Sequence, residues 1–278
     1  MKLIRAFFMS LGMFSVIPCP RVWDEKARPL MLAFLPLVGL VIGLIWYGLY
    51  LLTRMTQVPL PLKAALLMLY PYLITGFIHL DGFMDTSDAL LSRRTLEEKL
   101  RILKDPHTGA FAVISVAVLF ILCYAAMTAV MEKVSMDSIQ YAAPERAMAV
   151  LIFIPVITRC CSSIAVLAGK PLAHSQYRTE EGTKKPAAEI AVLCIMGLAA
   201  GLAAPAAAAG FGASGAETPA LQGAAVSIVL MVLAMTLASY LVAILGAARQ
   251  LNGVSGDLAG YALIVGEGVA VVTLAVML

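Results

Sequence analysis

The sequence predicts an all-α, polytopic integral membrane protein with about seven transmembrane helices and an interfacial amphipathic helix. Two observations predict this class. Hydrophobic residues make up 61% of the 278 residues and charged residues only 13%, far from the composition of soluble globular proteins. The apolar residues also form runs near the ~20 residues that a helix needs to cross a bilayer, and they do not alternate as barrel strands would. We therefore expect one membrane-embedded domain over residues 1–278.

Each apolar run predicts one span. The predicted spans are Met31–Thr53, Leu60–Ile78, Phe111–Met131, Ala147–Ala168, Ala187–Ala209, Leu221–Ala248 and Leu258–Leu278. Before them, Met1–Pro20 has a basic start and an apolar middle without a small-residue cleavage site, so we expect an interfacial helix there rather than a signal peptide. Arg93–Leu103 combines an apolar stripe with opposite charges four positions apart, which predicts an amphipathic helix on the membrane surface.

Lysine and arginine predict the orientation, because these residues concentrate on the cytoplasmic side of membrane proteins. If the N-terminus is inside, most of them fall in the inner segments 1–30, 79–111, 169–186 and 249–257. The outer side holds only Arg54, Lys63, Lys133 and Arg146. A net charge of +3, without a basic run interleaved with aromatic residues, argues against a nucleic-acid partner.

Three aspartates form the most informative motif. Asp81, Asp85 and Asp88 stand at i, i+4 and i+7, so a helix would hold them within roughly 60° of one face. Three carboxylates repel one another unless a cation joins them, and oxygen donors of this kind suit Mg²⁺ together with substrate phosphates. Gly82 would let a phosphate or a neighbouring helix approach, whereas His79 should face away and serve in packing or capping.

The alternative for these aspartates is a solvated helix end, where acidic residues are favourable without any ligand. Three of them on one face at the membrane boundary, with a fourth at Asp105, favour a metal site instead. We expect the surface helix to return the chain so that Lys104–Gly109 meets the aspartate face. Lys104 and His107 would then suit a phosphate, with an interfacial anchor as the alternative for either one.

Two further features lie near the C-terminus. Residues 252–257 form a turn-rich segment whose glycines could present backbone N–H groups to an anion, although an ordinary turn would look the same. Glu267 lies about ten residues into the last span, where an unpaired carboxylate is costly. Arg159 could pair with it, and both a structural and a functional role stay open for this pair.

These motifs together resemble the adenosylcobinamide-GDP ribazoletransferase family, also called cobalamin synthase. The matching blocks are His79-Leu80-Asp81-Gly82 with Asp85 and Asp88, Lys104-Asp105 with Gly109, and Gly253-x-Ser255-Gly256-Asp257. The likeness extends to Phe34–Gly39 and to Arg159, and so covers most of the chain in order.

The resemblance implies a membrane transferase that uses Mg²⁺. The ribose 3′-hydroxyl of α-ribazole, or of its 5′-phosphate, would attack the corrinoid-side phosphorus of adenosylcobinamide-GDP, forming cobalamin or its phosphate and releasing GMP. By this reading, the metal ligands are Asp81, Asp85, Asp88 and Asp105. The catalytic candidates are Asp88, Asp85 and Lys104. The substrate-binding candidates are Lys104, His107, Gly82, Gly109, Ser255 and Asp257.

The resemblance also implies a bacterial cytoplasmic (inner) membrane, with the lipid bilayer as a partner and the active site facing the cytoplasm. A homo-oligomer stays open. The alternatives are another Mg²⁺-dependent membrane transferase acting on a diphosphate, of the CDP-alcohol phosphotransferase or prenyltransferase type, and a membrane transporter. A prenyltransferase should show a second aspartate-rich block, and a transporter should place its charged motifs at mid-membrane.

Overall fold

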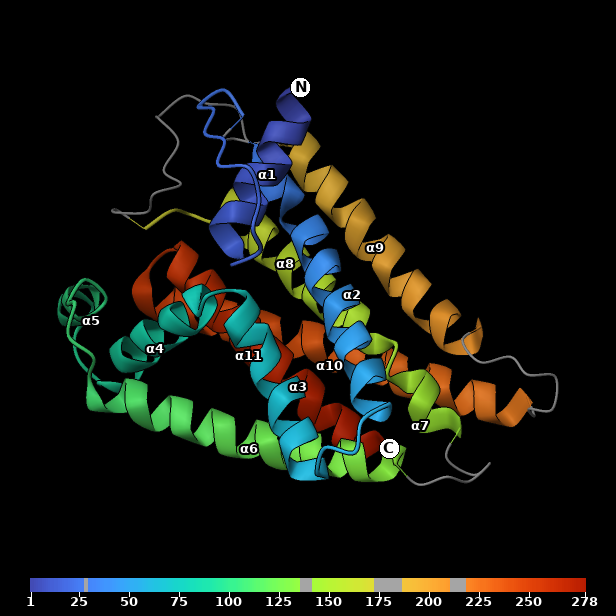
Figure 1. Cartoon of the computed structure of the whole chain (residues 1–278). Coiled ribbons are helices and arrows are strands. Elements are labelled where there is room, and N and C mark those ends of the chain that lie inside the picture. The colour runs from blue at the N-terminus through green and yellow to red at the C-terminus, as the bar shows by residue number, and fades with distance from the viewer. Residues whose placement is uncertain (28–29, 136–141, 173–186, 211–218) are drawn as a thin grey trace.

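The computed structural model describes residues 1–27, 30–135, 142–172, 187–210 and 219–278 (Figure 1). Over these ranges the chain is helical, and the prediction of an all-α fold is confirmed. The elements are α1 (Lys2–Phe14), η2 (Leu32–Phe34), α2 (Leu35–Arg54), α3 (Leu60–Ile74), α4 (Ile78–Leu91), α5 (Leu96–Ile102), α6 (Ala110–Val134), α7 (Ala142–Ala147), α8 (Val150–Ala168), α9 (Ala187–Gly210), α10 (Pro219–Leu251) and α11 (Gly256–Met277). The predicted inner segment 169–186 is described only as far as Leu172, and the rest of it lies outside the described residues.

Six helical stretches of the described chain are long and apolar enough to cross a membrane, and a seventh span results if α3 and α4 count as one. The prediction of about seven spans is therefore confirmed, but the prediction of a single helix over Leu60–Ile78 is wrong. α3 ends at Ile74, and α4 leaves it at an angle of 88°. Gly76 and Phe77 have φ angles of +59° and +63°, and this left-handed backbone breaks the helix.

Two glycines bring α2 and α8 into close contact. A Cβ atom at Gly39 would lie 2.5 Å from the carbonyl oxygen of Pro155, and one at Gly43 would overlap the carbonyl group of Ile152. Small residues four positions apart let two membrane helices approach until their backbones touch. α8 is accordingly the most buried of the candidate spans, whereas α6 and α9 expose most of their apolar side chains, which in a membrane face lipid.

α4 and α11 cross through a second pair of glycines. A Cβ at Gly82 would lie 2.8 Å from the carbonyl oxygen of Asp257, and one at Gly260 would lie 3.4 Å from the backbone of His79. Stacked rings of Phe83 and Tyr261, 5.6 Å apart, extend this contact. The helix that carries the three aspartates therefore packs directly against the start of the last helix (Figure 1).

The two predicted peripheral helices are present. α1 covers most of Met1–Pro20, and α5 covers all of Arg93–Leu103 except its first three residues and its last one. α5 begins later than predicted because Thr95 caps it: the Thr95 hydroxyl accepts a hydrogen bond from the amide of Glu98, whose carboxylate accepts one from the Thr95 amide. The helix therefore does not start at Arg93, although Arg94 still lies within electrostatic range of Glu98, as the predicted pairing requires. Lys99 donates to Gln250 at 2.7 Å, which holds α5 against the end of α10.

Candidate active site

A cavity of about 450 Å³ lies where α1, α2, α4, α8 and α11 meet. Its wall combines apolar side chains with a smaller number of polar ones, as ligand pockets usually do. The polar residues that line it are His79, Asp81, Lys104, Ser162, Ser255 and Asp257. Segments from three of the sequence motifs therefore meet at one cavity, although they lie far apart in the chain.

The aspartates of α4 lie on one helix, as their spacing predicts. Asp81 is exposed and borders the cavity, whereas Asp85 and Asp88 are half-buried and do not. Asp85 nevertheless lies within electrostatic range of Asp81, Asp88 and Asp257. The structure therefore adds a fourth carboxylate to this face, and it comes from α11 instead of from position 105.

Asp88 rests against the start of α6. A Cβ built on Gly109 would overlap the Asp88 carboxylate, so only glycine fits at this position. Gly109 is also the N-cap of α6, and the positive end of a helix dipole stabilises a carboxylate placed there. The expected contact between the Lys104–Gly109 segment and the aspartate face is thus present at its last residue.

Lys104 borders the cavity, but Asp105 and His107 do not. The Asp105 carboxylate accepts hydrogen bonds from the His107 amide at 3.0 Å and pairs with the His107 Nδ1 at 2.7 Å. These contacts with His107 hold the pKa of Asp105 below its ordinary value. Both side chains are exposed at the surface, so the prediction that the whole segment turns toward the aspartates is wrong for these two residues.

The segment before α11 is held in place by its own hydrogen bonds. The Ser255 hydroxyl accepts from the Leu258 amide at 3.3 Å and donates to Asp257 at 3.4 Å, so Ser255 is the N-cap of α11. The backbone of Val254 pairs with the chain after α8. The Val254 amide donates to the Lys170 carbonyl at 2.8 Å, and the Val254 carbonyl accepts from the Leu172 amide at 3.0 Å. This pairing fixes Ser255 and Asp257 at the cavity.

Gly82 contributes to the site through helix packing. Sequence reasoning left open whether a phosphate or another helix would approach it, and the structure places the backbone of Asp257 there. The prediction that His79 serves in packing is confirmed, because its ring is buried and stacks on Phe14. His79 also lines the cavity, however, which its position opposite the aspartates did not suggest.

Carboxylates of the described chain do not form a ready-made metal cluster: no three His, Cys, Asp or Glu side chains there lie close enough to hold an ion. The four predicted ligands are therefore not gathered around one point. The donor chemistry of the α4 face still fits Mg²⁺, which commonly binds one or two carboxylates and takes its other oxygens from water and substrate phosphates.

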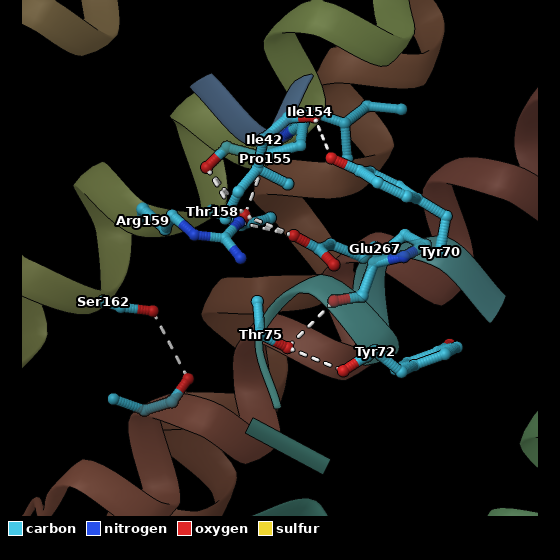
Figure 2. A network of polar contacts seen from close by, with 12 residues as sticks. Ile42, Tyr70, Tyr72, Thr75, Ile154, Pro155, Thr158, Arg159, Ser162 and Glu267 are labelled. Atoms are coloured by element: carbon cyan, nitrogen blue, oxygen red, sulfur yellow. Dashed lines mark hydrogen bonds and ion pairs between the residues drawn. The ribbon is translucent and has the colours of Figure 1, made fainter. Parts of the chain in front are cut away.

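Glu267 and Arg159 form the buried ion pair that the sequence suggested. Figure 2 shows the guanidinium of Arg159 pointing at Glu267, with an Nη1–Oε1 distance of 2.9 Å. The same carboxylate oxygen accepts from the Thr158 hydroxyl at 3.1 Å, and Arg159 Nη1 also donates to the Pro155 carbonyl at 3.2 Å. The pair links α8 to α11 one helical turn from Ser162, which lines the cavity.

Sequence reasoning missed the apolar wall of the cavity. Met13, Phe14, Leu32, Leu35 and Val166 belong to one cluster of apolar contacts between α1, the start of α2 and the end of α8. The amphipathic pattern of Met1–Pro20 was the only signal available, and it does not tell a helix that packs on protein from one that packs on lipid.

Comparison with known proteins gives a consistent result. The family model of cobalamin-5-phosphate synthase matches residues 6–275. An adenosylcobinamide-GDP ribazoletransferase of Clostridium perfringens (strain 13 / Type A) is 38% identical over 276 residues, which is 98% of both chains. One of Clostridium botulinum (strain Alaska E43 / Type E3) is 34% identical over 96% of this chain and 95% of its own. No solved structure matches this chain. Its near-complete match to the family model and to these relatives shows that the chain belongs to the cobalamin-5-phosphate synthase family.

Proposed function

We propose that this chain is an adenosylcobinamide-GDP ribazoletransferase, which forms adenosylcobalamin or its 5′-phosphate in vitamin B12 biosynthesis. The family match over nearly the whole chain supports this activity over a prenyltransferase or a transporter. The structural observation that carries the proposal is the convergence of Asp81, Asp257 and Lys104 on one cavity. Two carboxylates and a cation facing the same space suit a reaction between a hydroxyl group and a diphosphate.

The reaction breaks one bond of the diphosphate and forms one ester bond. The ribose hydroxyl oxygen of α-ribazole, or of its 5′-phosphate, attacks the phosphorus on the corrinoid side of adenosylcobinamide-GDP. The bond from this phosphorus to the bridging oxygen breaks, and GMP leaves with that oxygen. The proton of the hydroxyl passes to a carboxylate of the enzyme.

We assign separate roles to the residues that line the cavity and to those beside it. Asp81, which lines the cavity, and Asp85, four positions later on α4, would hold Mg²⁺ together with phosphate oxygens. The metal would supply neutralisation of the charge on the two phosphates. Asp257, on the facing helix, would accept the hydroxyl proton, and Lys104 would balance the charge of the departing GMP. Asp88 would support the site indirectly, through the contact between its carboxylate and Gly109 at the start of α6.

Asp105 and His107 stay candidates of lower rank. Their side chains pair with each other at the surface, so a contact with metal or phosphate would require that pair to separate. Gly109 supports the site through its close contact with Asp88, and Ser255 supports it as the cap that holds Asp257.

We further propose that the protein lies in the bacterial cytoplasmic membrane with the cavity facing the cytoplasm. The relatives are bacterial, and the described helices are apolar enough to span a bilayer. Lysine and arginine concentrate in the segments that include the α4–α6 connection. GDP-activated substrates and GMP are water-soluble groups of the cytoplasm, which this orientation would place at the cavity.

The experiment uses purified protein in detergent or liposomes with adenosylcobinamide-GDP and either form of ribazole, with and without Mg²⁺. Wild type should release GMP and form the cobalamin product only with Mg²⁺. Asp81→Asn, Asp85→Asn and Asp257→Asn should each lower the rate by about 100-fold or more. Glu97→Gln, which neutralises an exposed carboxylate on α5, should retain full activity. A folded wild type that forms no cobalamin with either ribazole would refute the proposed function.

A further inference from the structure

We infer that the 450 Å³ cavity is the binding site of the acceptor nucleoside, with the aromatic base on its apolar wall and the ribose on its carboxylates. The corrinoid then stays outside the cavity and reaches it only with its diphosphate. This inference rests on the proposed function and assigns one of its two substrates to a place in the fold.

The apolar wall suits an uncharged aromatic base. Phe14 and Met13 at the end of α1, Leu32 and Leu35 at the start of α2, and Val166 on α8 contact one another in one cluster and line the cavity together. A methyl-substituted benzimidazole carries almost no polar surface, so its transfer from water to this wall is favourable. A corrin ring bearing many amide groups would leave those amides without partners there.

The carboxylate wall suits the ribose. Asp81 and Asp257 lie within electrostatic range of each other, and Ser255 is hydrogen-bonded to Asp257. Hydroxyl groups donate to carboxylates, and an attacking hydroxyl must lie beside the group that takes its proton. A nucleoside held between the two walls therefore presents its ribose where we place the chemistry.

His79 connects the two walls. It lies on α4 two positions before Asp81, and its ring stacks on Phe14 with the ring centres 6.1 Å apart and the planes inclined by 20°. The residue is only 7% exposed, and its ring, stacked on Phe14, forms part of the cavity wall. The two stacked rings extend the surface on which an aromatic base can lie.

The volume of the cavity suits the smaller of the two substrates. Pockets for drug-sized molecules measure roughly 300–1,000 Å³, and the cavity lies near the lower limit of this range. A benzimidazole nucleoside is a molecule of that size. Adenosylcobinamide-GDP combines a macrocycle, an adenosyl group and a nucleotide, and is several times larger than the nucleoside.

The test makes the cavity smaller by enlarging one residue of its apolar wall. Val166→Phe adds an aromatic ring to that wall, and Val242→Phe makes the same change on the exposed, lipid-facing surface of α10. Binding of α-ribazole and of adenosylcobinamide-GDP to the purified proteins is measured separately by equilibrium dialysis, together with the KM of each substrate. We expect Val166→Phe to weaken α-ribazole binding by about tenfold or more and to leave corrinoid binding unchanged. Val242→Phe should change neither.

A second measurement tests the apolar wall with wild type and does not depend on the stability of a variant. An imidazole riboside lacks the fused benzene ring and the methyl groups of the base, and it should bind to wild type at least about tenfold more weakly than α-ribazole. Equal binding of both nucleosides to wild type would overturn the assignment of the base to the apolar wall.

The outcomes separate this inference from the proposed function. If wild type forms cobalamin but Val166→Phe weakens the corrinoid instead of the nucleoside, or weakens neither, the cavity is not the acceptor site and the function survives. If wild type forms no cobalamin, the proposed function fails first, whatever the nucleoside binding shows.

Discussion

Removing the buried carboxylate of Glu267 should destabilise the protein by about 3–5 kcal/mol, because its partner Arg159 would then lie unpaired in the interior. The side chains of Arg159 and Glu267 are 1% and 5% exposed, and their charged atoms lie 2.9 Å apart. At an effective dielectric constant of about 20, this distance corresponds to an attraction of about 6 kcal/mol. Desolvation of the two ions, several kcal/mol each, cancels most of it, so the intact pair contributes little net stability. The large effect appears only when one partner is lost.

This reasoning predicts a specific pattern among variants. Glu267→Leu and Arg159→Met should each destabilise strongly, whereas the double variant should regain most of the loss because no unpaired charge remains. Val272→Ala, a truncation on the partly exposed side of the same helix, is the control for a change in α11 itself.

The assay is reversible unfolding in mixed detergent, followed by the fluorescence of Trp46. This residue is almost fully buried, and its indole donates to the Leu67 carbonyl at 2.9 Å, so its emission reports the packing of α2 against α3. Trp23 is exposed and is replaced by phenylalanine in every variant to remove its signal. If Glu267→Leu shifts the unfolding midpoint no more than Val272→Ala, or if the double variant is as unstable as the sum of the singles, the argument from buried charge is wrong.

Three further predictions follow from local geometry. Gly39→Ala should destabilise the protein by about 1–3 kcal/mol because its Cβ would meet a backbone carbonyl of α8, whereas Gly48→Ala, with open space around it, should be neutral in the same unfolding assay. Gly109→Ala should displace the carboxylate of Asp88, lowering product formation by about 100-fold, and a variant with normal activity would contradict the contact. Hydrogen bonds from the Thr95 cap lower the pKa of Glu98 below its usual 4.5, so the cap's contribution is complete above that pH and is lost as the pH falls through the lowered pKa. The protection factor of the α5 amides, which is the ratio of the intrinsic to the observed exchange rate at each pH, should therefore fall only in acid.

The spans could be predicted from the sequence because each one is a long apolar run, and hydropathy depends only on composition. The 88° break after α3 could not, because Gly76 and Phe77 interrupt a run that stays apolar on both sides. Only the backbone angles show that the helix ends there. A break of this kind depends on what packs against the bend, and a single sequence does not contain that information.

The acidic face of α4 was predictable because a helical period fixes which aspartates share a face. The exposed position of Asp105 could not be predicted, because it depends on local hydrogen bonding. The carboxylate is satisfied by the amide and ring of His107, two residues later, and this short-range hydrogen bonding competes with any longer-range role. The arrival of Asp257 at the same face depends on a crossing of two helices far apart in sequence, which glycine at position 82 permits and does not by itself indicate.

Because Gly82 contacts Asp257, the site can be completed only after both of their helices have been synthesised. The two positions are 175 residues apart in the chain, since 257 minus 82 is 175. At a translation rate of about 5–20 residues per second, α4 is made about 9–35 s before its partner helix emerges. Throughout that interval the acidic helix has neither the α11 backbone against it nor the fourth carboxylate beside it. A nascent chain stalled before Gly256 should therefore already hold most of its spans in the membrane and still show no transferase activity, because the last helix to be inserted is the one that closes the site.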